Sequence, residues 1–425
     1  MKLVIHPETT KAMNQILAIF KFSILTFFIF LTQTTQAQNE TGIFPSWEEG
    51  EMEIHHINTA RGESVFCIFP DGTNMLIDAG DLGPSVDPVH TTTLPNDTKQ
   101  PGEWIGRYIS RLVKYRSEKK IDFALLTHFH GDHMGTISPE SPKTQNGGDY
   151  LLTGLTEVAE YVPFKNMIDR DWPTYQYPSP LKGRKVFDNY KKFMDWNVEN
   201  SNMQAGRFQP GSNSQFSLLY QPEKYPGFEV RNIYANGEIW AGEKDNTTYL
   251  FPKDAAVDEN KICAVIRISY GDFDYFNGGD INGRISIKSA PWRDIETPVG
   301  KVVGPIEVCE VNHHSYVDAM NESFIVSTQP QVFIIQAWNA RHNNLTTLRA
   351  MSSTELYPEK RHIFSTNIHE FAKNYLGQNL DKFSGYGGHV VIKVQPGGDE
   401  YKVYLLTAED ESMSIKSEFG PFICK

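Results

Sequence analysis

The spacing of hydrophobic and polar residues predicts a layered α/β protein. Two short apolar runs, Ser64–Phe69 and Met75–Asp78, flank a Pro-Asp-Gly-Thr turn, which is typical of a β-hairpin. Apolar positions between Ile105 and Val113 recur at helical spacing, and Ile121–Thr127 then has the continuous apolar character of a buried strand. Strand, helix and strand in succession indicate an α/β arrangement.

Regular strands are expected again after residue 260. They are predicted at Ile262–Tyr270, Lys301–Val311 and Gln331–Trp338, followed by a terminal hairpin of His389–Val394 and Tyr401–Leu406. The stretch from about 138 to 260 is rich in Asn, Gly, Pro, Tyr and Trp and has few long apolar runs. We therefore expect an irregular insertion there rather than a separate core.

The N-terminus carries the pattern of a secretory signal. Ile16–Leu31 is an almost unbroken apolar run, preceded by Lys11 and followed by the small and polar residues of Thr32–Ala37. This order predicts a signal peptide over residues 1–37 and a mature domain over 38–425, with an uncleaved N-terminal anchor as the alternative. We expect a secreted or periplasmic protein with no membrane segment after signal removal.

The composition is that of a globular, acidic protein. Hydrophobic residues make up 40% of the chain and charged residues 22%, and 40 Lys and Arg face 52 Asp and Glu, for a net charge of −12. Removing residues 1–37 makes the net charge −14. This balance argues against a nucleic-acid coat or a basic membrane-surface module, so we expect a small-molecule substrate or the end of a polymer. The oligomeric state is left open.

Metal-binding chemistry is concentrated directly after the strand Ile121–Thr127. His128, His130, Asp132 and His133 lie within six positions where that strand becomes a loop. Imidazoles and carboxylates are the ligands expected for zinc and similar divalent ions, and four donors so close together can serve one ion or two. Gly131 is expected to let the backbone turn so that the donors converge. The alternative is a surface cluster of His without a metal.

The His-x-His-x-Asp-His spacing matches the signature of the metallo-β-lactamase superfamily. Met75–Gly80 resembles the early strand of that family with its Asp-x-Gly turn, and Phe276–Asp280 resembles its Gly-Asp motif. Glu310–Ser315 and Arg61–Ser64 resemble the His-His-Gly-Ser element and the Gly-Gln-Gly-Asp turn of the ComEC-like branch, which comprises the hydrolase domain of competence proteins and its exported relatives. The resemblance implies an αββα sandwich with the site at one edge.

The resemblance also implies metal-binding roles for individual residues. It places His128 and His130 on a first metal ion and Asp132 and His133 on a second. Asp280 is expected between the two ions.

Further roles follow from the same resemblance. His313 or His314 completes the second ion, and we favour His314 as the ligand and His313 as a substrate contact. Asp132 is expected to assist proton transfer besides binding metal. Asp78 is expected to orient a metal-binding His through a hydrogen bond.

One departure from the family pattern changes the expected metal chemistry. The superfamily usually supplies a further His to the first ion, yet no His lies between Met134 and Asp280. Asp169 or Asp171 is the candidate replacement, with a solvated Asp-Arg-Asp turn as the alternative. An oxygen-richer site would accept Mn²⁺ or Fe²⁺ besides Zn²⁺, and it would hold one or two ions.

The sequence therefore predicts an exported metal-dependent hydrolase. Its attacking group would be a metal-bound hydroxide, and its substrate a phosphodiester or another ester. Hydrolysis of a lactam, lactone or thioester is the second hypothesis. The third is a catalytically silent protein that binds a metal or a ligand.

Overall fold

The structure of the protein is a computed structural model that describes residues 42–83, 89–177, 184–253, 255–284, 286 and 288–425. The predicted signal peptide lies outside these residues. Within the described ranges, no helix combines the length and the apolar character needed to cross a membrane.

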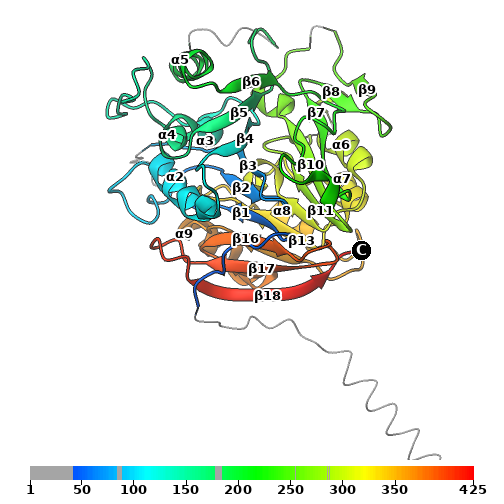
Figure 1. Cartoon of the computed structure of the whole chain (residues 1–425). Helices are drawn as coiled ribbons and strands as arrows, with labels where there is room; N and C mark the ends of the chain where they lie inside the picture. Colours follow the sequence, from blue (N-terminus) through cyan, green and yellow to red (C-terminus); the bar gives the residue numbers. More distant parts are fainter. Residues whose placement is uncertain (1–41, 84–88, 178–183, 254, 285, 287) are drawn as a thin grey trace, which may run out of the picture. The chain divides into compact units, whose positions relative to one another are not determined.

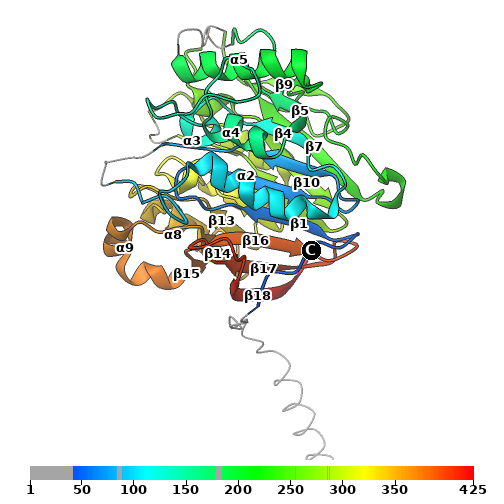
Figure 2. The same ribbon diagram turned by 60° about the vertical axis from the view of Figure 1, so that its left-hand side comes forward.

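The first of two large sheets contains nine strands within the described residues, in the order β18-β17-β16-β1-β2-β3-β4-β5-β6. The strands are β1 (Met52–His56), β2 (Val65–Ile68), β3 (Asn74–Ile77), β4 (Ile121–Leu126), β5 (Phe164–Asp169), β6 (Gln204–Arg207), β16 (His389–Val394), β17 (Glu400–Leu406) and β18 (Ile415–Ile423). Strands β3 to β6 run parallel to one another, and the other pairs are antiparallel. Figure 2 shows β16, β17 and β18 side by side.

The second sheet also has nine strands among the described residues, in the order β15-β14-β13-β12-β11-β10-β7-β8-β9. The strands are β7 (Phe228–Ala235), β8 (Glu238–Trp240), β9 (Thr247–Tyr249), β10 (Val265–Tyr270), β11 (Phe273–Asn277), β12 (Val308–Glu310), β13 (Val332–Ile335), β14 (His362–Ser365) and β15 (Phe383–Tyr386). Strands β11 to β15 are parallel, whereas β7 to β11 pair antiparallel.

Helices cover the outer face of each sheet. On the first sheet these are α2 (Pro101–Leu112), α4 (Gly154–Tyr161) and α5 (Lys185–Asn200), while the short α3 (Gly131–Met134) follows β4. On the second sheet they are α6 (Glu296–Val303), α7 (Glu322–Thr328), α8 (Leu345–Met351) and α9 (Glu370–Leu376). In Figure 1, α2 and α4 lie on one side of the paired sheets and α6 and α7 on the other.

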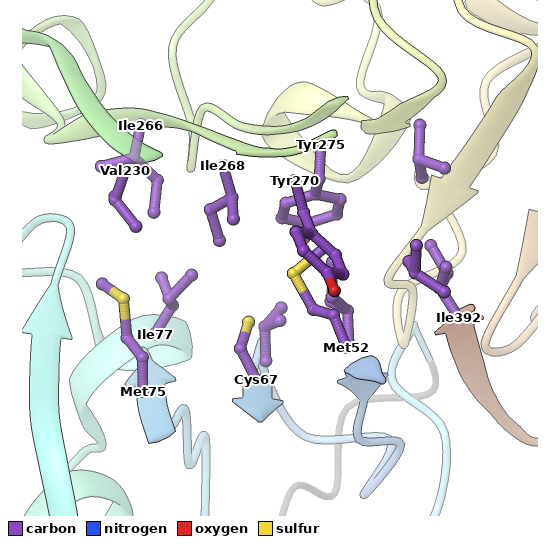
Figure 3. Packing of buried hydrophobic residues seen from close by; sticks show 14 of the residues in the cluster. Met52, Cys67, Met75, Ile77, Val230, Ile266, Ile268, Tyr270, Tyr275 and Ile392 are labelled. Atoms are coloured by element: carbon purple, nitrogen blue, oxygen red, sulfur yellow. The ribbon is translucent and has the colours of Figure 1, made fainter. Parts of the chain in front are cut away.

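The main core lies between the two sheets, as Figure 3 shows. Because successive side chains of a strand point to opposite faces, Met75 and Ile77 of β3 enter this core. Leu76 instead packs against the helices on the outer face. From the second sheet, Ile266 and Ile268 meet the same core. Each such buried aliphatic side chain contributes about 1.5–3 kcal/mol relative to an exposed one. The order helices, sheet, sheet, helices confirms the predicted α/β class and the predicted αββα sandwich.

Two stretches differ from the sequence-based expectation. Lys301–Val303 are not strand but the end of α6, because Val299 and Val303 form the buried face of an amphipathic helix. Residues 138–260 are not an irregular insertion throughout, since they carry α4, α5 and the strands β5 to β9. These strands lie toward the edges of both sheets, where mixed polar composition is tolerated.

Candidate metal centre

The candidate site is built at the ends of four strands. Strands β3 and β4 are parallel neighbours in the first sheet, and β11 and β12 are parallel neighbours in the second. The carboxyl ends of parallel strands meet at one edge of a sheet, which is where polar loops can converge. Asp78, Thr127–His133, Asp280 and His313–His314 follow these four strand ends in turn. The sandwich thus brings Asp78 and His314, which are 236 positions apart along the chain, to the same edge.

Close backbone packing sets the position of α3, which carries Asp132 and His133. A Cβ at Gly80 would overlap the carbonyl oxygen of Asp132, so the loop after β3 can lie directly on α3 only because residue 80 is glycine. Gly131 does not have the positive φ expected for a turn. It is needed because a Cβ there would overlap the Thr136 side chain.

An inner group of donors consists of Glu63, His133, Asp280 and His314, all buried. Oδ1 of Asp280 lies 3.2 Å from Nε2 of His133 and 3.1 Å from Nε2 of His314. Oδ2 of Asp132 lies 3.6 Å from the same nitrogen of His314. Two nitrogens bound tetrahedrally to one zinc ion at 2.0–2.1 Å are roughly 3.3 Å apart, so these separations suit a shared ion.

An outer group consists of His128, His130 and the same Asp280. Nε2 of His128 lies 3.0 Å from Nδ1 of His130 and 3.7 Å from Oδ2 of Asp280. His128 is fully buried, whereas His130 is partly exposed. Asp280 therefore presents one oxygen to each group, which is the intermediate position that the resemblance implies.

Buried oxygen atoms face the ring nitrogens that point away from the donors. Nδ1 of His133 donates to Oδ2 of Asp78 over 2.7 Å, which is the orienting contact expected for Asp78. Oε2 of Glu63 lies 3.3 Å from Nδ1 of His314. On the outer group, Nδ1 of His128 contacts the Thr127 hydroxyl at 3.1 Å, and that hydroxyl donates to Asp78. A hydrogen bond at one ring nitrogen fixes the tautomer and leaves the other free to bind a metal.

The carboxylates of the site favour positive charge among the donors. Burial and the nearby Glu310 carboxylate raise the pKa of Glu63 well above its usual range. Burial and the neighbouring imidazoles of His133 and His130 lower the pKa of His128 well below its usual range, so its ring is neutral. Burial also lowers the pKa of His133 and of His314, but Asp280 and the other nearby carboxylates outweigh burial and raise the pKa of His133 well above its usual range and that of His314 to about 9. A site in which carboxylates favour positive charge this strongly is one that a divalent cation suits.

Unpartnered atoms test whether the residues fit a metal. The buried atoms Oε1 of Glu63, Nε2 of His133, Oδ1 of Asp280 and Nε2 of His314 have no hydrogen-bond partner. A buried polar atom without a partner costs about 1–3 kcal/mol, and four in one place would be a heavy penalty. The two imidazole nitrogens and the Asp280 oxygen lie within 3.1–3.2 Å contacts, so one divalent cation would satisfy them together. The cluster fits a divalent metal site, and its chemistry does not by itself fix which metal.

The His313–His314 turn is held in an unusual backbone conformation. His313, His314 and Ser315 have φ of 45°, 53° and 61°, which costs a non-glycine residue about 1–2 kcal/mol each. Backbone hydrogen bonds to Gly279 and Asn344 hold the turn. The result is that His314 points into the inner group, while His313 remains partly exposed beside it.

His313 and Asp132 lie where a substrate can reach them. Nδ1 of His313 donates to Asp318 over 2.8 Å, and its Nε2 lies 3.9 Å from Oδ2 of Asp280. Burial lowers the pKa of His313, but Asp280 and Asp318 outweigh burial and raise it to about 9. The Asp132 side chain is 25% exposed, unlike Asp280 at 2%.

The structure does not bring Asp169 or Asp171 into either group. Oδ1 of Asp169 accepts from the backbone N–H groups of Asp171 and Trp172, and its Oδ2 accepts from the hydroxyls of Tyr175 and Tyr190. Oδ2 of Asp171 accepts from the backbone of Tyr177. Both carboxylates therefore stabilise their own loop after β5. The outer group is left with two imidazoles and one shared carboxylate.

Sequence reasoning missed two residues near the centre. The sequence points to Glu63 only through the Arg-Gly-Glu-Ser turn, which does not by itself indicate a metal-binding role. His342 stacks on His314 with ring centroids 4.9 Å apart, and burial and His314 lower its pKa well below its usual range. His342 lies in a late loop without a recognisable motif, so no sequence signal points to it.

No protein-family model matches the chain, and no curated protein matches it either. Among solved structures, the chain is similar to a new diphosphatase from the PhnP family, with 10% sequence identity and a TM-score of 0.34 over 81% of this chain and 98% of that one. The fold is accordingly assigned from the strand order and layers described above.

Proposed function

We propose that the protein is a metal-dependent hydrolase of the metallo-β-lactamase superfamily, of its ComEC-like branch, that cleaves a phosphodiester or another ester. The observation that carries this proposal is the set of buried, unpartnered nitrogens and carboxylate oxygens at one edge of the sandwich. A divalent ion held there supplies positive charge and lowers the pKa of a water molecule toward neutrality.

The chain's own residues supply the remaining chemistry. Asp132 is partly exposed beside the inner group, so its carboxylate can accept a proton from the attacking water. His313 stands at the partly exposed side of the site, where its Nε2, which lies 3.1 Å from the Asn260 side chain, can contact a substrate oxygen. Asp318 fixes the orientation of that ring through Nδ1.

The proposal includes export, which rests on the apolar run near the N-terminus alone. Expression in a bacterial host with fractionation tests it, because cleavage before Gln38 gives a new N-terminus that sequencing identifies. Retention of residues 1–37 on the cell-associated protein would contradict it.

A substrate panel with metal analysis tests the enzyme proposal. The purified protein, reconstituted with Zn²⁺ or Mn²⁺, is expected to bind at least one ion per chain and to hydrolyse bis(p-nitrophenyl) phosphate. Nitrocefin and a set of lactones and thioesters serve as the competing substrates. Cleavage of those substrates alone would replace the phosphodiester assignment, and a metal-replete protein inert on the whole panel would overturn the enzyme proposal.

A further inference from the structure

The inner and outer groups share Asp280 but differ in how many donors they contain. In the inner group, Nε2 of His133, Nε2 of His314 and Oδ1 of Asp280 lie within 3.1–3.2 Å contacts, the Asp132 carboxylate lies 3.6 Å from Nε2 of His314, and Glu63 faces the far nitrogen of His314. The outer group has Nε2 of His128, Nδ1 of His130 and Oδ2 of Asp280. A tetrahedral ion takes four ligands, so among the described residues the inner group can complete an ion and the outer group falls one ligand short.

The groups also differ in what supports their imidazoles. Each inner imidazole faces a buried carboxylate across its far nitrogen, Asp78 behind His133 and Glu63 behind His314. In the outer group, His128 contacts only a neutral hydroxyl in this way. Carboxylate partners raise the basicity of a ligating ring, and loss of such a partner typically costs about 10- to 100-fold in metal affinity.

Solvent reaches both groups at one residue each. In the outer group His130 is partly exposed while His128 is buried, and beside the inner group Asp132 is partly exposed while His133, His314 and Asp280 are buried. The Asp169 and Asp171 carboxylates, which could have closed the outer group, are engaged in their own loop. The outer position that lacks a protein ligand thus lies beside a partly exposed imidazole, where a small anion can reach it.

We infer that the inner group holds a resident ion, and that the outer group binds a second ion weakly until a phosphoryl oxygen of the substrate or product supplies its missing ligand. This inference rests on the proposed phosphoesterase function. Under this inference, phosphate increases the affinity of the outer group for the second metal ion. By thermodynamic linkage, the second metal ion increases the affinity for phosphate by the same factor.

Calorimetric titration of the metal-free protein with Mn²⁺ tests the inference without an activity assay. Two binding steps are expected, the second at least about 10-fold weaker than the first. Inorganic phosphate is expected to tighten the weaker step and to leave the tighter one unchanged, and Mn²⁺ is expected to tighten phosphate binding by the same factor. Sulfate, a tetrahedral anion of different basicity, is the comparison ligand and is expected to have a smaller effect.

Three variants assign the steps to residues. His130→Ala is expected to abolish the weaker step and keep the tighter one, and His314→Ala to abolish the tighter one. His369→Asn is the matched control, because it removes an imidazole far along the chain while Asn retains the N-cap of α9. It is expected to leave both steps unchanged.

The outcomes separate this inference from the proposed function. Two equal steps, a weaker step that ignores phosphate, loss of the tighter step in His130→Ala, or no Mn²⁺ binding would each overturn the inference. If hydrolysis of phosphodiesters accompanies two equal steps, the function stands and the inference fails. If unequal, phosphate-coupled steps occur in a protein inert on every ester, the inference about the metals stands and the enzyme proposal fails.

Discussion

The metal centre and the Arg170–Glu259 ion pair both bury carboxylates, but only in the ion pair does every carboxylate oxygen have a protein hydrogen-bond partner. Arg170 donates from Nε and Nη2 to the two oxygens of Glu259 over 2.8 and 2.9 Å, and Oε1 of Glu259 also accepts from the backbone N–H of Phe129. Nη1 of Arg170 donates to the Tyr177 carbonyl and to Asn236. No polar side-chain atom of this pair lacks a partner among the described residues.

The contrast distinguishes a structural charge cluster from a functional one. Phe129 lies between His128 and His130, so the satisfied ion pair and the unsatisfied metal centre contact the same loop. The Arg170–Glu259 cluster is complete without any added group, whereas the metal centre has four buried polar atoms, Oε1 of Glu63, Nε2 of His133, Oδ1 of Asp280 and Nε2 of His314, that protein neighbours do not satisfy. The incompleteness of the metal centre is what indicates a bound cation.

Removal of the shared carboxylate is expected to have the largest effect. Asp280→Ala takes one oxygen from each group, so both metal steps and hydrolysis should be lost, with kcat/KM falling on the order of 10³-fold or more. Metal analysis and steady-state kinetics measure this. Asp272→Ala, in the exposed turn at the other end of β11, is the control and should retain both properties. Full metal content in Asp280→Ala would contradict the assignment of the site.

Breaking the ion pair should instead reduce stability. Arg170→Ala leaves the Glu259 carboxylate buried without its counter-charge, which is expected to cost about 3–5 kcal/mol in the free energy of unfolding while the metal stoichiometry is kept. The double variant Arg170→Met/Glu259→Gln removes both charges and keeps an acceptor for Phe129, so it should lose less. Denaturant unfolding and metal analysis check both. If Arg170→Met/Glu259→Gln is less stable than Arg170→Ala, the instability of Arg170→Ala is not caused by the unpaired charge of Glu259.

Metal removal is expected to lower the free energy of unfolding through the loss of the ion at the metal centre. Dialysis against a chelator should lower the free energy of unfolding by about 2.7 kcal/mol relative to protein at a free metal concentration of 100 times Kd. Thermal unfolding with and without metal measures the difference. In His314→Ala, the free energy of unfolding with and without metal should differ much less than in the wild type. An equal difference in the variant and the wild type would show that the stabilising ion binds elsewhere.

A third buried carboxylate, Glu157 of α4, extends the comparison because burial and acidic neighbours outweigh the nearby Lys99 in its surroundings. Burial, followed by the charges of Asp81 and Glu103, raises its pKa to about 8, and its Oε2 has no hydrogen-bond partner. The folded state therefore binds its proton more tightly than the unfolded state does. Its contribution to stability is fully present below the unfolded pKa of about 4.5 and is lost as pH rises toward about 8.

Glu157→Gln is expected to flatten this pH dependence. The wild-type free energy of unfolding should fall by at most about 1.4 kcal/mol per pH unit between pH 5 and 8 from this group. Denaturant unfolding across that range, in wild type and variant, measures the slope. Identical slopes would show that Glu157 is not the titrating group.

Spacing alone predicts the part of the centre that is local in the sequence, whereas Asp78, Asp280 and His314 follow only from the family resemblance. His128 to His133 form one short motif, so their proximity follows from spacing. Glu63 reaches the centre because its backbone N–H donates to the carbonyl of Asp132 and its carbonyl accepts from Gly80, contacts between distant segments. Such contacts leave no periodic pattern.

The same reasoning explains the failures in the fold. The strands β2 to β4 are central and nearly all apolar, so they were predictable, whereas β6 and β9 are short, polar and at sheet edges. An acidic residue at the end of a strand can turn toward a site or toward its own loop. The Asp169 side chain turns toward its own loop because Oδ1 accepts hydrogen bonds from the backbone N–H groups of Asp171 and Trp172. These contacts form only in the folded chain, so the sequence does not predict them.

The division of the metal-binding residues between the two sheets has a consequence for the order of folding and metal binding. His133 follows a strand of the first sheet, and Asp280 and His314 follow strands of the second, so neither half of the chain holds a complete ligand set. We expect tight metal capture to be a late event in folding, possible only once the interface between the sheets has closed. An ion held there would join residues of both sheets, so a chain whose two sheets separate during degradation would be expected to release its metal at the same step.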